Sequence, residues 1–190
     1  MMILHNQKDK LGNWLPKVEK LYDESGSPRW FEHPVHGSKV DCVALPLMET
    51  EGVHFYPYNE YGKSSPVYLS PADSVSVIGF PFGLMGGGAC AIWATGFIAS
   101  EPKMNLNDLP LMLIDCRGRP GQSGSPVLVH KPNGGPIDAG DHFAGALGGP
   151  ITIALGIYSG RINKHSDLGM VWKMSAVWDI VDFAADQIAG

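Results

Sequence analysis

The chain has 190 residues, a formal net charge of −5 and only 17% charged residues, whereas 44% of its residues are apolar. Its 24 glycines and 15 prolines are typical of a turn-rich globular β-protein, and the lack of a lysine and arginine cluster argues against binding to nucleic acid. No apolar run reaches the length of a membrane span, and the first six residues turn polar too early for a signal peptide, so we expect a cytoplasmic protein.

The first part of the chain predicts strands separated by strong turn signals. Residues 14–22 have the composition of an extended strand, and the polar residues 23–28 predict a turn, which together indicate a hairpin. Residues 39–47 predict a buried strand with Asp41 at its entrance. Residues 49–72 are rich in aromatic side chains and proline, and we interpret them as a crossover between two parts of the fold.

The rest of the chain alternates predicted strands with loops. Residues 81–88 form a glycine-rich loop that lacks the Gly-Lys-Ser/Thr ending of a phosphate-binding loop, and residues 131–141 predict a polar loop. Together with the strands, these loops indicate an all-β fold. Apolar patterning predicts the strands at 74–80, 91–100, 111–116, 127–129, 151–160 and 169–174.

A helix is predicted at the C-terminal end of the chain. Val177, Val181, Ala184 and Ile188 recur at helical spacing and form one apolar stripe. Ser175 precedes this stripe and is the residue type that caps a helix N-terminus. We therefore expect an amphipathic helix with Ser175 as its N-cap, closing the fold through its apolar stripe.

Residues 119–126 read Arg-Pro-Gly-Gln-Ser-Gly-Ser-Pro and carry the clearest chemical signal of the chain. A nucleophilic serine needs its hydroxyl at the tip of a tight turn, and Gly121 and Gly124 allow the backbone to turn on both sides of Ser123. In such a turn the N–H groups of Gly121 and Ser123 would point at one spot and form an oxyanion hole. The alternative interpretation is an ordinary Gly/Ser/Pro turn of a β-protein.

The segment Gly-Gln-Ser-Gly-Ser-Pro-Val resembles the Gly-x-Ser-Gly-x-Pro motif of chymotrypsin-like (trypsin-like) serine peptidases, and its ending is most similar to compact bacterial members such as glutamyl endopeptidases. The resemblance implies two antiparallel six-stranded barrels followed by a C-terminal helix, with Ser123 as the nucleophile of an endopeptidase. It implies an incomplete first barrel in residues 1–65, and a second barrel with the closing helix in residues 66–190.

The segment Asp-x-x-Ala-Leu, which begins at Asp41, resembles the one that carries the orienting carboxylate in this family. Asp41 precedes Ser123 by 82 residues, in agreement with the family's order and rough spacing. Such a carboxylate accepts the Nδ1–H of the catalytic histidine and fixes its tautomer. The alternative is an aspartate that closes a loop. Ser159 and Gly160 occupy the place of the family segment that pairs with the backbone of a peptide or protein substrate.

The histidine of the family is missing from its expected place. In the family it precedes the aspartate in a turn such as Thr-Asn-x-His-Val, and His5, His33 and His36 do not lie in such a sequence. We interpret the chain as beginning inside the first barrel, whose open edge a partner chain could cover. We expect low peptidase activity, with His5 as the fallback base. The alternative function is a non-catalytic peptide-binding module, a pseudoprotease.

The residues just before the active turn would form the floor of the specificity pocket, by the same resemblance. Arg117 and Arg119 lie in this segment. They either favour an acidic substrate side chain or form salt bridges with carboxylates such as Asp115, and the sequence leaves both possibilities open.

We expect neither a cofactor nor a metal site. The spacing of His33, His36 and His54 is too generic to indicate a metal site, and no Cys-x-x-Cys pair is present. The cysteines lie in apolar sequence and are expected to be buried free thiols. They are Cys42, Cys90 and Cys116.

Overall fold

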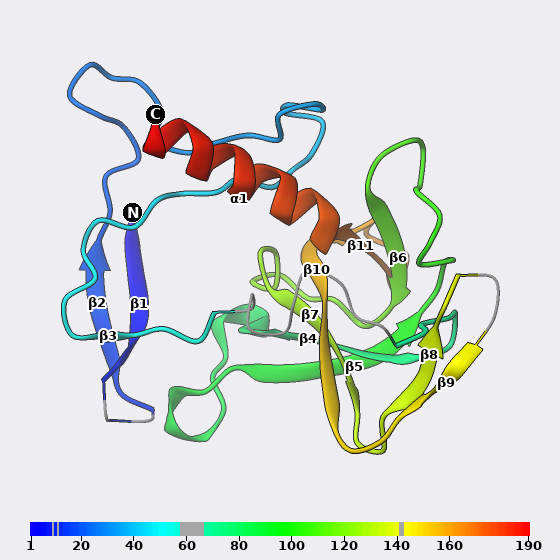
Figure 1. Cartoon of the computed structure of the whole chain (residues 1–190). Helices are drawn as coiled ribbons and strands as arrows, with labels where there is room; N and C mark the ends of the chain where they lie inside the picture. Colours follow the sequence, from blue (N-terminus) through cyan, green and yellow to red (C-terminus); the bar gives the residue numbers. More distant parts are fainter. Residues whose placement is uncertain (9, 11, 58–66, 141–142) are drawn as a thin grey trace.

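The computed structural model describes residues 1–8, 10, 12–57, 67–140 and 143–190, and it is mostly β with one α-helix (Figure 1). Its centre is a closed six-stranded antiparallel barrel with the strand order β10-β11-β6-β5-β4-β7. Every barrel strand lies at a place where the sequence predicts one, and all strand ends agree with the prediction within two residues. The strands are β4 (Ser74–Gly79), β5 (Ile92–Ile98), β6 (Leu111–Asp115), β7 (Pro126–Lys131), β10 (Ile151–Arg161) and β11 (Leu168–Lys173).

The barrel forms because alternate residues along its strands are apolar and face its interior. Val77, Ile114, Val127 and Val171 have no exposed surface and belong to one continuous core cluster. Burying an aliphatic side chain of this size contributes roughly 1.5–3 kcal/mol. The interior of the barrel is therefore a large source of stability, and it holds the strands that carry Ser123.

The first strand of a short hairpin lies within the loop predicted at residues 131–141. The hairpin consists of β8 (Gly135–Asp138) and β9 (Phe143–Leu147), and Lys131 is the last residue of β7. The loop prediction is wrong here because a two-stranded hairpin has only edge strands, where proline and glycine are tolerated.

The N-terminal residues form a small three-stranded sheet beside the barrel (Figure 1). Its order is β2-β1-β3, with β1 (Met2–Gln7), β2 (Trp14–Val18) and β3 (Val53–His54). The strand predicted at 14–22 is thus shorter, and its partner is β1. The hairpin predicted around residues 23–28 is reduced to a single bridge between Tyr22 and Pro28, because β2 ends at Val18, before the predicted turn.

The buried strand predicted at residues 39–47 is not formed. This segment makes one isolated bridge, between Phe31 and Ala44. Val40 is only 2% exposed whereas Val43 is 51% exposed. The segment packs against α1 and against Leu111 and Trp172 of the barrel strands. Its apolar residues are therefore buried by side-chain contacts rather than by strand pairing.

Part of the predicted crossover cannot be compared with the structure. The crossover of residues 49–72 includes β3 at Val53–His54 and an isolated bridge at Val67. Residues 58–66 lie outside the described part of the chain, and so does the domain boundary predicted between residues 65 and 66.

The C-terminal helix is confirmed, but its cap is not the one predicted, and its buried face shares only Ala184 with the predicted stripe. Helix α1 (Met174–Ala189) has Lys173 at the N-cap position, without a side-chain capping bond. The buried face consists of Ala176, Ile180 and Ala184, while Val181 and Ile188 of the predicted stripe are exposed. Contacts with Val40 and Trp172 set this face. In the part of the chain that is described, no helix is long and apolar enough to cross a membrane.

Glu19 is a buried carboxylate that ties the end of β2 to a distant segment. Its side chain is 1% exposed, and Oε1 accepts the N–H groups of Met48 at 2.9 Å and Glu49 at 3.0 Å. Arg29 Nη1 lies 3.8 Å from Oε2. The hydrogen bond from the Glu49 N–H is the main reason why the pKa of Glu19 is lowered. The Met48 N–H and the Arg29 guanidinium lower this pKa further, whereas burial opposes the shift.

The Glu19→Gln variant is expected to be less stable than the unaltered chain at neutral pH, by an amount that shrinks in acid. Because the folded pKa is lowered, the stabilisation by Glu19 is present above the usual carboxyl value of about 4.3 and is lost as the pH falls through the folded pKa. Urea unfolding of both proteins between about pH 7 and about pH 3 measures this. A stability difference that does not change with pH would contradict a role for the charge.

Candidate active site

The turn at Ser123 is held by glycines and by a buried glutamine. Gly121 has a φ of 91° and Gly124 a φ of 84°, values that favour glycine. Gln122 is fully buried, and its Oε1 accepts the N–H of Arg119 at 2.7 Å. The Gln122 N–H donates in turn to the Arg119 carbonyl at 3.2 Å. These two bonds hold the turn on the N-terminal side of Ser123.

Strand β10 fixes the other side of the turn. The Gly124 N–H donates to the Tyr158 carbonyl, and the Tyr158 N–H donates to the Ser125 carbonyl, both at 2.8 Å. The pairing of β10 with β11 shifts register between Tyr158 and Gly160. The irregularity places Ser159 beside Ser123.

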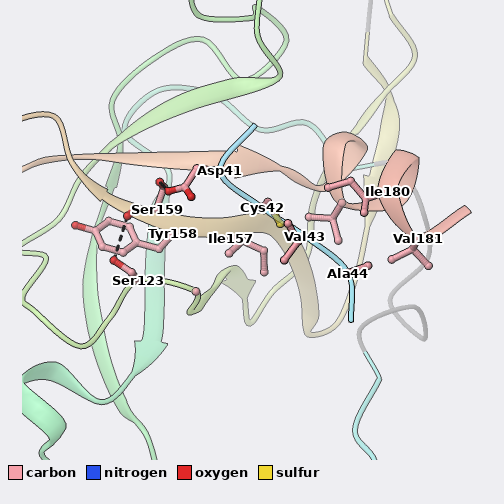
Figure 2. A pocket seen from close by; sticks show the side chains of 12 residues that line it. Asp41, Cys42, Val43, Ala44, Ser123, Ile157, Tyr158, Ser159, Ile180 and Val181 are labelled. Atoms are coloured by element: carbon pink, nitrogen blue, oxygen red, sulfur yellow. Dashed lines mark hydrogen bonds between the residues drawn. The ribbon is translucent and has the colours of Figure 1, made fainter. Parts of the chain in front are cut away.

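Ser159 joins Ser123 and Asp41, as Figure 2 shows. The Ser159 Oγ donates a hydrogen bond to Asp41 Oδ2 at 3.0 Å. The Ser159 carbonyl oxygen accepts a hydrogen bond from Ser123 Oγ at 3.1 Å. The structure therefore brings together three residues that the sequence singles out, from three separate segments of the chain.

Two backbone donors of the turn are unused. Within the described residues, neither the N–H of Gly121 nor that of Ser123 donates a hydrogen bond. Unpaired N–H groups in a tight turn are the kind of donors that bind an anion. Gly121 must remain glycine because a Cβ there would lie 2.5 Å from the Phe80 carbonyl oxygen.

A pocket of about 530 Å³ opens beside Asp41 and Ser123 (Figure 2). We call it the helix-side pocket because Val177, Ile180 and Val181 of α1 line it. Its volume exceeds that of an imidazole ring, and no histidine is among the described residues that line it. The other lining residues are Cys42, Val43, Ala44, Gly124, Ile157, Tyr158 and Ser159.

Cys42 lines the helix-side pocket next to Asp41. Burial first, and the Asp41 carboxylate second, raise the pKa of the Cys42 thiol. The thiolate is the nucleophilic form of cysteine, and a raised pKa favours the thiol form of Cys42 at neutral pH.

The histidines considered as bases are held elsewhere. His5 lies in β1 and lines neither pocket at Ser123. His33 is buried, and its Nδ1 accepts the N–H groups of Val35 and His36, each at 3.2 Å. Its Nε2 lies 3.4 Å from Asp179 Oδ2. His33 is therefore engaged by its own loop and by α1.

A second pocket, of about 320 Å³, also opens at Ser123, and we call it the cationic pocket. Arg119, Arg161 and Lys164 are its charged lining residues. Arg161 and Lys164 are absent from the sequence prediction, although a signal for them exists: both follow the Ser-Gly pair at the end of β10 within four residues. The remaining lining residues are Gly118, Pro120, Tyr158, Gly160 and Asn163.

The two arginines predicted to meet substrate have different positions. Arg117 is exposed and lines neither pocket at Ser123. Arg119 lines the cationic pocket, and its Nη1 lies 3.9 Å from Asp167 Oδ1. The nearby carboxylate is thus Asp167 from the segment before β11, and not Asp115.

Among the described residues, no group of three or more His, Cys, Asp or Glu side chains is arranged to hold a metal ion. The three cysteines are free, but only Cys116 is fully buried. Cys42 is half-buried and Cys90 is exposed, so the prediction of a buried thiol is wrong for Cys90. Cys90 follows the short 3-10 helix Gly87–Ala89 in the glycine-rich loop, which is largely exposed.

Comparisons with protein-family models, with curated proteins and with solved structures found no match to this chain. The chemical interpretation of the site therefore depends on its geometry. That geometry consists of a serine in a glycine turn, a carboxylate joined to it through Ser159, and two pockets that open at the serine.

Proposed function

We propose that the chain is the scaffold of a trypsin-like serine endopeptidase, with Ser123 as nucleophile and Asp41 as the carboxylate that orients the base. The observation that carries this proposal is the bridge through Ser159, which hydrogen-bonds both residues. In a catalytic triad the nucleophile and the carboxylate must flank one imidazole, so they have to lie close to each other. The helix-side pocket offers space for that ring beside both groups.

In the proposed reaction Ser123 Oγ attacks a peptide carbonyl carbon, and its proton passes to the imidazole of a histidine. None of the described residues places a histidine in this position. The carbonyl oxygen becomes an oxyanion, to which the N–H groups of Gly121 and Ser123 donate hydrogen bonds. The imidazolium then gives its proton to the leaving amine. Water releases the acyl group from Ser123 in the second half of the reaction.

The imidazole would enter the helix-side pocket next to Asp41. The Asp41 carboxylate would accept one ring N–H, which leaves the other ring nitrogen as an acceptor. That nitrogen would replace the Ser159 carbonyl as the acceptor of the Ser123 hydroxyl. The role assigned to Asp41 is thus to fix the tautomer of a base.

We also propose that the N-terminal sheet and residues 31–44 belong to a second, open barrel of the chymotrypsin-like type. The segment that carries Asp41 packs against α1 and the closed barrel. Val43 on this segment and Val181 on α1 remain 51% and 39% exposed beside the helix-side pocket. A peptide substrate would bind in this region, along Ser159 and Gly160.

A non-catalytic peptide-binding module is the second candidate function. One observation favours it: the Ser123 hydroxyl donates a hydrogen bond to the main-chain carbonyl of Ser159, and no imidazole from the described residues lines either pocket at Ser123. Such a module would keep the pockets and the strand β10 for binding a peptide, without acylation of the serine.

Chemical rescue separates the two functions. The unaltered chain is expected to react slowly with a fluorophosphonate probe. Added imidazole is expected to increase the labelling rate at least about tenfold. This is less than the ~10²–10⁴-fold that a general base contributes when the protein holds it in position. Mass spectrometry should locate the label on Ser123. Ser123→Ala should remove the labelling, and Asp41→Asn should weaken the effect of imidazole.

Two outcomes would contradict this account. Rapid labelling without imidazole that disappears in His5→Ala would identify His5 as the base. Labelling that imidazole does not accelerate, or that falls on other residues, would favour the peptide-binding module.

A further inference from the structure

The hairpin of β4 and β5 presents large apolar side chains to solvent. Phe82 is 64% exposed, Leu84 58% and Met85 54%, and all three lie in the loop of residues 80–91, which we call the apolar loop. Trp93 follows this loop in β5 and is 56% exposed. Figure 1 shows the loop in green, projecting from the barrel where β4 and β5 are joined. A group of exposed apolar side chains of this size marks a binding surface.

The same hairpin carries no charge. Residues 74–100, which comprise β4, the apolar loop and β5, contain no Asp, Glu, Lys, Arg or His, although 17% of the whole chain is charged. On the strands next to the loop, the hydroxyls of Ser76 and Thr95 hydrogen-bond each other at 3.0 Å. Protein partners are usually selected through charged and polar groups around an apolar centre. This hairpin offers no charged group, and it fits an apolar medium better than the polar rim of a protein interface.

The backbone of the apolar loop forms hydrogen bonds within the loop. The N–H groups of Gly83 and Leu84 each donate to the carbonyl oxygen three residues earlier, at 2.9 Å. The Gly86 N–H donates to the Cys90 carbonyl at 2.8 Å. A backbone N–H without a partner is costly in a lipid environment, where water cannot replace the missing bond. These three N–H groups can therefore leave water at no such cost.

Phe82 is exposed in spite of an unfavourable backbone conformation. Its φ is 55° and its ψ is 21°, which is the left-handed region that glycine and asparagine adopt more readily than a bulky residue. A ring that is 64% exposed recovers little of this cost by packing inside the protein. Unfavourable conformations of this kind are retained where a function needs them, and here the retained feature is an exposed aromatic ring.

Two contacts hold the apolar loop in place. The Phe82 N–H donates to the Pro120 carbonyl of the serine turn at 2.6 Å. On its other side, the loop touches the turn between β1 and β2, because a Cβ on Gly12 would lie 2.8 Å from the Gly88 carbonyl oxygen. The exposed side chains are thus presented by a loop that is already ordered, which lowers the entropy cost of binding.

We propose that the apolar loop and Trp93 dock the protein on a lipid bilayer without net charge, with Phe82, Leu84 and Met85 inserted among the headgroups. Charge selects this kind of surface: the protein has a net charge of −5, so an anionic bilayer repels it, and the hairpin has no cation to offset the repulsion. Tryptophan and phenylalanine are suited to the boundary between headgroups and acyl chains. The inference goes beyond the proposed function and does not depend on it.

The test is co-sedimentation of the full chain with sucrose-loaded vesicles of phosphatidylcholine. The bound fraction is expected to rise with the lipid concentration and to change little with added salt, because the contact is apolar. Adding phosphatidylserine to the vesicles should lower the bound fraction, because the protein and the vesicle then carry charge of the same sign.

Variants assign the binding to the loop. Phe82→Asn should weaken the affinity for vesicles at least about tenfold, because burial of a phenyl side chain contributes at least this factor. Its thermal stability should be unchanged or higher, since asparagine tolerates the left-handed conformation. Tyr56→Asn is the matched control: it removes an aromatic side chain that is 63% exposed on another segment, and it should bind like the unaltered chain.

A chain that does not sediment with phosphatidylcholine vesicles would overturn the proposal, and so would equal binding by the unaltered chain and Phe82→Asn. Binding that phosphatidylserine strengthens and salt removes would assign the contact to charges instead. Dimerisation in sedimentation velocity that Phe82→Asn abolishes, without vesicle binding, would assign the loop to a second copy of the chain. Ser123→Ala should bind vesicles like the unaltered chain, so the result is independent of the labelling experiment.

Discussion

Gly121→Ala is expected to eliminate imidazole-dependent labelling of Ser123, with a loss of at least about 100-fold, the lower end of the effect of removing one oxyanion-hole donor. The φ of 91° at Gly121 places an alanine in the left-handed region, which costs about 1–2 kcal/mol. In addition, its Cβ would lie 2.5 Å from the Phe80 carbonyl oxygen and 3.3 Å from the Phe82 nitrogen. Both are main-chain atoms, so the turn itself has to move.

Gly124→Ala is the matched control for this prediction. Gly124 has a φ of 84°, but no atom lies within 4 Å of a Cβ built on it. The two variants therefore share the backbone strain and differ in the steric overlap. Labelling rates with imidazole, and urea unfolding, should be measured for both. If Gly121→Ala is labelled as rapidly as Gly124→Ala, the turn does not supply the oxyanion donors.

Gly96→Ala is expected to destabilise the barrel by about 3 kcal/mol or more, the upper end of what overpacking usually costs. Gly96 lies in β5, next to the residue where pairing with β6 begins. A Cβ at this position would overlap the carbonyl oxygen of Asp115 and lie 2.8 Å from the Cα of Cys116. Two strand backbones cross here at a distance that only glycine allows. Such a loss is a large fraction of a typical total stability of roughly 5–15 kcal/mol.

Gly148→Ala provides the comparison for Gly96→Ala. Gly148 is exposed, has no positive φ and has no atom within 4 Å of a built Cβ. Urea unfolding, monitored by tryptophan fluorescence, should give nearly the same midpoint for Gly148→Ala as for the unaltered chain. Equal stability of the two alanine variants would mean that β5 and β6 do not approach each other this closely.

The barrel strands and the helix could be predicted because their signals are local. Alternation of apolar and polar residues over 74–80 is sufficient to place β4, and helical spacing after residue 174 is sufficient to place α1. These patterns arise from the geometry of one strand or one helix. They do not depend on which other segment becomes its partner.

The pairing of the N-terminal strands and the exact buried face of the helix were predicted only in part, because both depend on which other segments they pack against. Residues 14–18 pair with β1 and not with the segment after the nearest turn, and residues 39–47 bury side chains without entering a sheet. On α1, the cluster around Val40 and Trp172 selects Ala176 and Ile180 in place of Val181 and Ile188. An apolar stripe indicates that a helix has a buried side, but the neighbouring segments determine how the helix is rotated about its axis.

The features of the candidate site can likewise be separated into those that the sequence predicts and those that depend on the tertiary structure. By itself, the sequence identified a serine turn that only glycines can form, together with Asp41 and Ser159 as residues to be brought near it. The tertiary structure alone decided that Ser159 hydrogen-bonds both of the others, that Arg117 lies outside the pocket, and that Arg161 and Lys164 line it. The physical reason is the distance along the sequence over which the interactions act. The conformation of a turn is set by a few adjacent residues, whereas a pocket is formed by side chains from distant segments that only the closure of the barrel brings together.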